Sequence, residues 1–360
     1  MDAPTAPVTT GAVVAAGPLD AYRASAARRT AIIVAALALV VVTFTADMVT
    51  GPAMLTIRQV ASAIFAPVAG ASDATTHVII WTLRLPMATM ALLVGAALGS
   101  AGAEVQTILD NPIADPYTLG LSASAGFGAA TAILFGQLLP MDPAYSATGA
   151  AFCCSLLAAL VILAVSRRQP SIETMVLTGI ALLFLAQALL SLLEYLASPE
   201  ALQTIVFWLF GSLTRATWAK AGMVTVALAV ILPALARDAW RLTALRLGEE
   251  RARSLGVNVA ALRIRVFTAI ALLTAVAVSF VGTIGFVGLV APHVARMLVG
   301  EDQRYFLPMS AICGALFLSA ASVLSKLVLP GALFPIGIVT SLIGVPCFFA
   351  LILRTRRGYW

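Results

Sequence analysis

Nine charge-free apolar runs constrain this chain more than any other feature of its sequence. They cover Thr30–Ala46, Leu85–Ala103, Pro116–Met141, Pro143–Ser166, Thr174–Leu193, Ala221–Ala236, Val266–Pro292, Tyr305–Ser325 and Leu327–Leu353. A helix needs about 20 apolar residues to cross a bilayer. The chain is 61% hydrophobic and 11% charged, whereas soluble domains carry about 25% charged residues. We therefore expect an all-α polytopic membrane protein.

The seventh run is unusual because glycine and proline interrupt it. Gly282, Gly285, Gly288 and Pro292 follow one another within Val266–Pro292. These interruptions indicate a full span that ends near Gly285, followed by a half-helix from about Leu289 to Val299. The expected total is ten transmembrane helices, nine long and one short. The apolar stretch Ala201–Thr214 is too short to span and predicts a re-entrant or surface helix.

The basic residues gather on one side of this arrangement. With the N-terminus inside and ten crossings, the inner segments are 1–29, 104–116, 166–173, 237–265, 296–304 and 354–360. All but five of the 22 basic residues fall there, the exceptions being Arg58, Arg84, Arg215, Lys220 and Lys326. Positive charge marks the cytoplasmic side. The pattern predicts a disordered cytoplasmic tail over 1–29, a permease domain over 30–354 and a cytoplasmic tail over 355–360. The basic residues report orientation and do not indicate nucleic-acid binding.

The sequence contains no motif that would supply energy for transport. Neither lysine, Lys220 or Lys326, follows a glycine, so the Gly-Lys-Ser/Thr of a phosphate-binding loop is absent. Energy must come from a partner or from an ion gradient. Carboxylates in the spans are few, and Asp47, Glu104 and Glu194 all lie near span ends, where a charge can reach water. With two histidines and four cysteines in no metal-binding spacing, we expect no metal site, no cofactor and no catalytic residue.

The long inner segment 237–265 contains a charged run, Leu247-Gly-Glu-Glu-Arg-Ala-Arg-Ser-Leu-Gly-Val. The run predicts a short helix bounded by Gly248 and Gly256, with Glu249 and Arg253 as a favourable i,i+4 pair. A solvated connector is the simpler alternative. Apolar residues flank the charges, however, and such a face suits a cleft on another protein. We expect Gly248, Glu249, Glu250, Arg253 and Gly256 to form a contact that couples this chain to a soluble partner.

The broken seventh span predicts the translocation pathway. Helices interrupted at membrane depth are typical of transporter binding sites, so Gly285, Gly288, Pro292 and His293 are the candidate pathway residues. His293 follows Pro292 at the start of the half-helix. Its imidazole is expected to hydrogen-bond a carbonyl freed by the break, which is a structural role. The loop Asp110–Gly120 contains two prolines and predicts an inner turn.

Seven ordered motifs together resemble the FecCD-type permeases, the membrane subunits of type II ABC importers for ferric siderophores, haem and cobalamin. They are Arg84-Leu-Pro, Leu92-Leu-Val-Gly-Ala-Ala-Leu, Gln106 with Asn111-Pro-Ile-Ala-Asp-Pro-Tyr-Thr-Leu-Gly, Trp208-Leu-Phe-Gly-Ser-Leu, the charged run from Leu247, Gly285-Phe-Val-Gly-Leu-Val-Ala-Pro-His with Arg296, and Phe334-Pro-Ile-Gly-Ile-Val-Thr with Gly344-Val-Pro. The resemblance covers about residues 55–355. The stretch Pro330-Gly-Ala-Leu-Phe-Pro-Ile-Gly is most similar to iron–siderophore members.

The resemblance implies a ten-span subunit in the bacterial cytoplasmic membrane that forms a homodimer, or a heterodimer with a sister permease, around a central pathway. Two cytoplasmic ATPase subunits, which bind the ATP, would dock on the charged run. A substrate-binding protein would dock outside, with Arg84 and Lys326 at the family's docking positions. The chain departs from the family pattern at Met87, Ser322 and Leu333, where Arg, Asp and Glu are frequent. It also departs at Glu104, which replaces an aliphatic residue.

Two alternatives stay open at this stage. The cargo could be haem or cobalamin instead of an iron–siderophore chelate, because pathway residues vary across the family. In a different class, the chain could be a gradient-driven secondary transporter. Copurification with an ATPase and a binding protein separates that class from an ABC importer.

Overall fold

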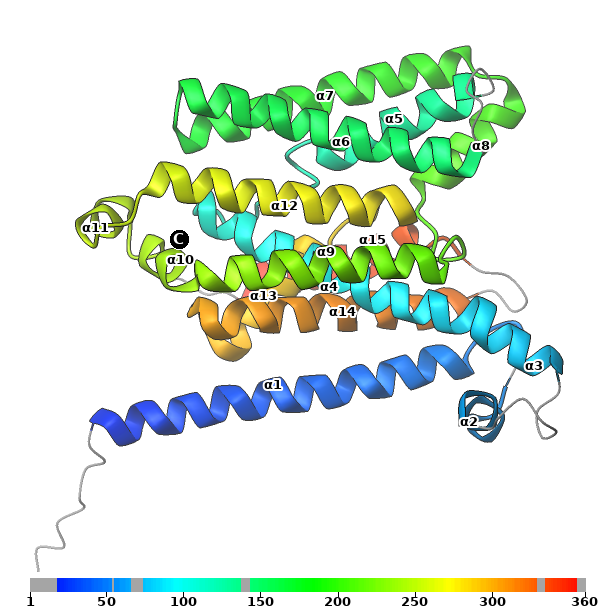
Figure 1. Cartoon of the computed structure of the whole chain (residues 1–360), viewed down its shortest axis with the longest axis horizontal. Coiled ribbons are helices and arrows are strands. Elements are labelled where there is room, and N and C mark those ends of the chain that lie inside the picture. The colour runs from blue at the N-terminus through cyan, green and yellow to red at the C-terminus, as the bar shows by residue number, and fades with distance from the viewer. Residues whose placement is uncertain (1–17, 54, 66–73, 137–142, 329–333, 355–360) are drawn as a thin grey trace, which may run out of the picture.

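Helices make up the regular structure of the computed structural model, which describes residues 18–53, 55–65, 74–136, 143–328 and 334–354 (Figure 1). Within these ranges no β-strand is present. The ten helices that match the predicted membrane segments are α1 (Pro18–Val49), α4 (Leu85–Ile108), α5 (Leu121–Phe135), α6 (Pro143–Arg168), α7 (Ile172–Leu196), α9 (Trp218–Arg237), α12 (Val259–Val281), α13 (Val287–Val299), α14 (Gln303–Leu327) and α15 (Ile336–Arg354). The predicted all-α polytopic fold is confirmed.

Six shorter elements connect these helices. They are α2 (Ile57–Phe65), α3 (Ala74–Val78), the π-helical turn η1 (Ile79–Arg84), α8 (Pro199–Leu209), α10 (Ala239–Leu245) and α11 (Glu249–Ser254). The elements α3, η1 and α4 join into one continuous apolar helix over Ala74–Ile108. The helix α8 confirms the short helix expected within Ala201–Thr214.

The predicted division into nine long helices and one short helix does not hold for α5, which covers only Leu121–Phe135. Seven helices in the described residues are long and apolar enough to cross a membrane, and the shorter apolar segments are Leu121–Phe135, Val287–Val299 and the part Ile336–Ala350 of α15. The run from Pro116 begins with a turn, in which the amides of Thr118 and Gly120 donate to the carbonyls of Asp115 and Tyr117 over 3.0 and 3.1 Å. Gly120 then adopts φ 77° and starts α5. Because Pro116–Gly120 form this turn, α5 is shorter than the apolar run that contains it.

The helix α1 also corrects the predicted disordered tail, because it begins at Pro18 and includes residues 18–29. This segment is rich in alanine and arginine, which favour helix. Arg29 joins this segment to α14 by two contacts. Its guanidinium forms an ion pair with Asp302 at 3.7 Å and lies over the Tyr305 ring as a cation–π contact. Residues 1–17, the tail 355–360 and Leu333 lie outside the described residues.

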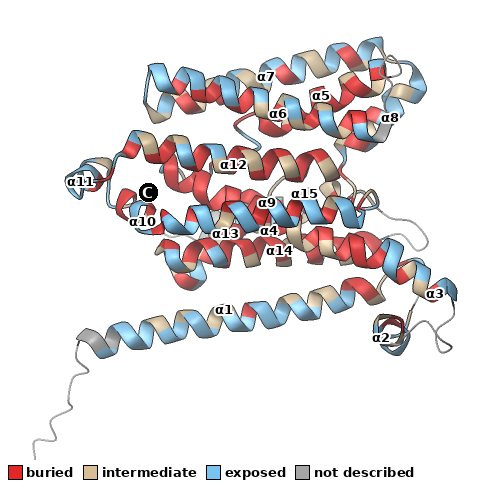
Figure 2. Cartoon of the chain, viewed as in Figure 1, coloured by how far each residue is buried: buried red, intermediate tan, exposed pale blue. Residues whose placement is uncertain are grey.

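The helices form two layers with α1 at one side (Figure 1). The helices α5, α6, α7 and α8 lie together, and the other layer contains α4, α9, α12, α13, α14 and α15. Buried residues concentrate in the second layer, whereas α1 and α7 are largely exposed (Figure 2). Within the most apolar windows, 61% of α12 and α14 is buried but only 17% of α1 and α7. The exposed surfaces of α1 and α7 are therefore suited to lipid.

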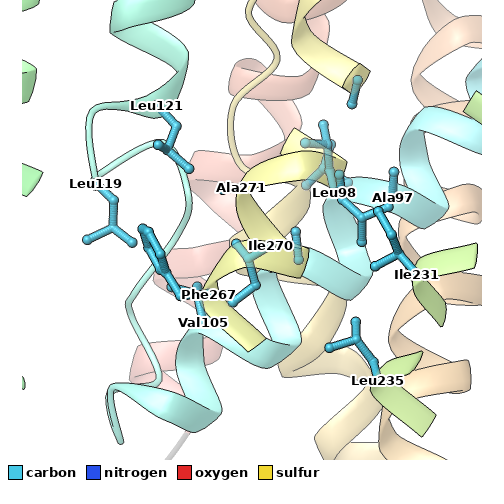
Figure 3. Close-up of a cluster of buried hydrophobic side chains, with 14 of the residues drawn as sticks. Ala97, Leu98, Val105, Leu119, Leu121, Ile231, Leu235, Phe267, Ile270 and Ala271 are labelled. Carbon is cyan, nitrogen blue, oxygen red and sulfur yellow. The ribbon is translucent and has the colours of Figure 1, made fainter. Parts of the chain in front are cut away.

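Close packing of α4 against its neighbours defines the core. A methyl group on Gly95 would overlap the carbonyl oxygen of Gly314, and one on Gly102 would overlap that of Gly288. Small residues let membrane helices approach at their backbones, where van der Waals contact replaces the hydrophobic effect as the source of stability. Beside these crossings, buried side chains of α4, α9 and α12 fill the interior (Figure 3), among them Val105, Ile231, Leu235, Phe267 and Ile270.

Candidate functional site

A cavity of about 740 Å³ opens beside the break between α12 and α13. Its lining comes from four parts of the chain: the turn after α4, the end of α8, the segment 283–289 and α15. The lining residues are Ile113, Asp115, Tyr117, Thr118, Leu209, Phe210, Thr283, Gly285, Phe286, Leu289, Gly337, Ile338, Ser341, Leu342, Val345 and Pro346. The cavity volume lies within the range of about 300–1,000 Å³ that small-molecule sites occupy.

The break itself is held open by backbone geometry. Gly282 ends α12 with φ 83°, and Phe286 precedes α13 with φ 67°, a left-handed conformation that is rare for a bulky residue. The Phe286 side chain packs directly on Gly344, where an added Cβ would lie only 2.5 Å from the Phe286 Cβ. Strain of this kind persists only where its surroundings hold it and is common at functional sites.

Neighbouring elements satisfy the backbone groups that the break frees. The amide of Ser212 donates to the Val281 carbonyl over 2.7 Å, and the Thr283 hydroxyl donates to the Leu209 carbonyl. The amide of Gly337 donates to the Phe210 carbonyl over 3.0 Å, so the start of α15 joins the same junction. Irregular backbone at membrane depth requires such partners. The residues after α8 thus connect α12, α13 and α15 into one wall.

The predicted pathway residues divide into two groups. Gly285 lines the cavity. Gly288 and Pro292 are buried in α13, and Gly288 lies against Gly102 of α4 and the Asp115 carboxylate. Their place is therefore in helix packing and not on the cavity wall.

His293 does not behave as predicted. Its side chain is half-buried, and among the described residues it makes no hydrogen bond to a freed carbonyl. The expectation of such a bond is wrong because the Thr283 hydroxyl and the amides around Gly211 already serve the break. His293 lies one helical turn after Leu289, which lines the cavity.

The charged run forms the helix α11, and both predicted boundaries lie in turns that favour glycine, with φ 104° at Gly248 and 82° at Gly256. The predicted pair is present, with Arg253 bonded to Glu249 over 2.5 Å. Arg263 of α12 donates to the same carboxylate over 2.8 Å and to the Ile108 carbonyl at the end of α4 over 3.2 Å. The helix α11 is thereby tied to both α12 and α4.

The outer face of α11 is open. Ala252 is the buried residue of α11, whereas Leu247 and Leu255, which flank the helix, are 55% and 52% exposed. Glu250 is exposed and makes no ion pair among the described residues, in contrast to Glu249. Two apolar side chains around an unpaired carboxylate form a surface that a protein partner could cover.

Sequence reasoning missed an ion network behind α11. Arg246 pairs with Asp110 at 3.1 Å and with Glu301, which also lies 3.2 Å from the Arg296 guanidinium. Arg296 donates to the Gln106 side chain over 3.1 Å. These residues come from the ends of α4, α10 and α13, far apart in the chain. No local spacing pattern could have indicated them.

Arg84 and Lys326 do not lie on an exposed rim, which corrects their predicted place at a docking surface. Arg84 is 5% exposed, and its guanidinium donates to the carbonyls of Met48, Val49 and Ala53. The Lys326 ammonium donates to the carboxylate of Asp47 over 2.8 Å and to its carbonyl over 2.9 Å. Both cations bind carbonyl or carboxylate groups at or just after the end of α1, and a sequence pattern could not show these contacts.

Of the positions that depart from the family pattern, the three that the structure describes, Met87, Glu104 and Ser322, are buried. Met87 packs in the core, and the Ser322 hydroxyl donates to the Asp47 carboxylate over 2.8 Å. Glu104 is fully buried on α4, and neither of its carboxyl oxygens has a hydrogen-bond partner in the part of the chain that the structure describes. Among the described residues, no cluster of three or more His, Cys, Asp or Glu could hold a metal ion.

Comparison with known proteins matches the model of the FecCD transport family to residues 38–354. The chain is 37% identical over 280 residues to a protein of Helicobacter pylori named as a probable iron chelatin transport system permease, covering 78% of this chain and 83% of that protein. It is 35% identical to the vitamin B12 import system permease BtuC of Vibrio cholerae, with 77% and 83% covered. A solved structure described as an inward-facing metal-chelate type ABC transporter superposes with TM-score 0.80 at 31% identity, covering 90% of this chain and 99% of that one.

Proposed function

This chain belongs to the FecCD transport family of ABC importer permeases, and from that membership we propose that it carries an iron–siderophore-type chelate across the cytoplasmic membrane. Transport proceeds by alternating access and is energised by separate ATPase subunits. The cavity beside the broken span supports this proposal most strongly. It places a ligand-sized space at strained, irregular backbone, as transporter sites require.

The ATPase contact is the outer face of α11. An exposed carboxylate between exposed leucines supports it, and so do the ties from Glu249 through Arg263 to the ends of α12 and α4. A displacement of α11 would reach α4, which packs against the first turn of α13 at Gly102 and Gly288. A movement of α11 on docking can therefore be transmitted through the packed helices α4 and α13 to the cavity wall.

The orientation follows from the same contact. Figure 1 shows α10, α11, the beginning of α1 and the end of α15 at one end of the molecule. With α11 in the cytoplasm, both termini are cytoplasmic. The opposite end faces outward and receives the substrate-binding protein. A second permease subunit, either the same chain or a sister, completes the pathway.

Reconstitution tests the proposal. The complex with its ATPase and binding protein, placed in proteoliposomes, should take up a ferric chelate in the presence of ATP and not in its absence. Uptake driven by an ion gradient without ATP would contradict it and favour a secondary transporter.

Cobalamin is the second candidate cargo, since the identity to BtuC is nearly as high as that to the iron chelatin permease. The same proteoliposomes, offered cobalamin, haem and ferric chelates in separate assays, identify the cargo. ATP-driven uptake of cobalamin alone would replace the iron assignment.

A further inference from the structure

The cavity wall carries one charge, and it is negative. Among the lining residues, Asp115 is the single ionisable acid, and none is lysine, arginine or histidine. The Asp115 carboxylate accepts a hydrogen bond from the Tyr117 amide over 3.0 Å. No lysine or arginine pairs with it in the described part of the chain. An anionic cargo would therefore find no counter-charge on this wall.

The N-terminus of a helix carries partial positive charge and attracts anions, so the start of α13 is the place where an anionic cargo would bind. In this protein, the carboxylate of Asp115 lies at that position. A Cβ built at Gly288, in the first turn of α13, would lie 2.9 Å from the Asp115 carboxylate oxygen Oδ1. The position that could receive an anionic group of the cargo is already occupied by a carboxylate.

Three of the four hydroxyl side chains on the cavity wall donate within the protein and not to the cavity, and Tyr117 is the fourth. The Thr118 hydroxyl donates to the Asp115 carbonyl over 2.7 Å, and the Ser341 hydroxyl donates to the Gly337 carbonyl over 2.8 Å. The Thr283 hydroxyl donates to the Leu209 carbonyl. Each hydroxyl has one hydrogen to donate. What these three side chains can offer the cavity is oxygen lone pairs, which accept hydrogen bonds.

We infer that the cargo crosses as a neutral or cationic chelate whose surface presents N–H or O–H donors, and that polyanionic chelates are excluded at this wall. The inference rests on the proposed function and narrows its substrate class. A polyanion moved from water to an apolar wall without a counter-charge loses several kcal/mol per charge. A neutral chelate avoids that loss, and its donors match the acceptors of the wall.

The charge of the wall can be measured without relying on transport. In the assembled complex, all four native cysteines (Cys153, Cys154, Cys313 and Cys347) are replaced by alanine, and Leu342 on the cavity wall is replaced by cysteine. A cationic and an anionic methanethiosulfonate reagent are then compared by their modification rates, each divided by its rate with a free thiol. We expect the cationic reagent to react several-fold faster, because a unit charge on the wall of the same cavity attracts a cation and repels an anion.

Two variants of the Leu342→Cys complex complete this test. Asp115→Asn should lower the rate ratio several-fold. Asp302→Asn, which removes a carboxylate at the α11 end of the molecule, should leave the ratio unchanged. A normalised rate that favours the anionic reagent, or a ratio that Asp115→Asn does not alter, overturns the inference.

Uptake by proteoliposomes then tests the cargo itself. The probes are a neutral ferric tris-hydroxamate and a trianionic ferric tris-catecholate, and the ratio of their uptake is compared between the wild type and Leu342→Lys. The same binding protein delivers both chelates to the wild type and to the variant, so its own preference cancels when the two uptake ratios are compared. We expect the variant to shift the ratio toward the trianion at least several-fold. Wild-type uptake of the trianion at the rate of the neutral chelate overturns the inference. Absence of ATP-driven uptake of every chelate, with the thiol result intact, overturns the proposed function instead.

Discussion

The two ends of the molecule use charge in opposite ways. At the α11 end, arginines and carboxylates share partners and stay in part open to water: the Glu301 side chain is 43% exposed, and those of Arg246 and Arg296, which both pair with it, are 14% and 15% exposed. At the opposite end, charged groups are enclosed. The side chains of Asp47 and Lys326 are 0% and 3% exposed, and Arg84 is bonded to backbone carbonyls. The first arrangement leaves part of its charge accessible to water, and the second joins helix ends.

This contrast shows why sign and position in the sequence are insufficient to assign a docking residue. Arg84 and Lys326 belong to the few cations predicted on the outer side, and the resemblance to the FecCD-type permeases implied a docking role for them. Their burial gives them a different role. Lys326 of α14 and Arg84 of η1 both bind the end of α1, where Met48 is also buried against η1 and α4, whereas the α1 span as a whole is largely exposed.

The largest effect should follow from breaking the buried pair. Lys326→Met leaves the Asp47 carboxylate enclosed without its cation, and we expect a loss of about 3–5 kcal/mol of stability. The measurement is the thermal unfolding midpoint of the detergent-solubilised complex. The double variant Lys326→Met with Asp47→Leu should regain most of the loss, because no uncompensated charge remains. A single variant as stable as the wild type would show that this pair is not enclosed in the membrane.

Arg84→Met should have the next largest effect. It removes the donor to the carbonyls of Met48, Val49 and Ala53. Hydrogen bonds to charged groups contribute about 1.5–3 kcal/mol each, so a loss of about 2–4 kcal/mol is expected for this set. The rate of association with the binding protein, measured on the folded fraction, should stay unchanged. A slower, salt-sensitive association with unaltered stability would restore Arg84 to the docking surface.

At the α11 end, Glu249 and Glu250 form a matched pair for separating docking from folding. Glu250 is exposed and unpaired, so Glu250→Lys should leave the unfolding midpoint unchanged. Association with the ATPase should weaken by about tenfold, which corresponds to 1.4 kcal/mol. Glu249→Gln instead removes the ties to Arg253 and Arg263. It should lower transport per ATP hydrolysed more than it lowers ATPase binding. Equal effects of the two variants on binding would argue against this division of roles.

The sequence was sufficient for the features that depend on local pattern. The apolar runs gave the number of membrane helices, and Gly248 and Gly256 marked the limits of α11 because those turns need glycine. Features set by tertiary contact were out of reach. Pro116–Gly120 is apolar enough to continue a span, yet it folds as a turn. The partners of Arg84 and Lys326 depend on which helix ends meet, and no spacing in the chain encodes that.

The smallest effect is expected at the exposed pair of Asp302 and Arg304, which is the counterpart of the buried pair at the other end. Hydrogen bonds from Arg304 at 2.7 and 3.0 Å hold the pKa of the Asp302 carboxyl below its ordinary value. Because the Arg304 side chain is 60% exposed, screening by water limits the pair to about 1 kcal/mol or less. A carboxyl with a lowered folded pKa stabilises the fold above its unfolded pKa of about 3.9 and loses that contribution as the pH falls through the folded value. Arg304→Ala should therefore shift the unfolding midpoint only slightly between pH 5 and 8, and the shift should shrink in high salt. A loss as large as that of Lys326→Met would mean that the two ends of the molecule do not differ in how they use charge.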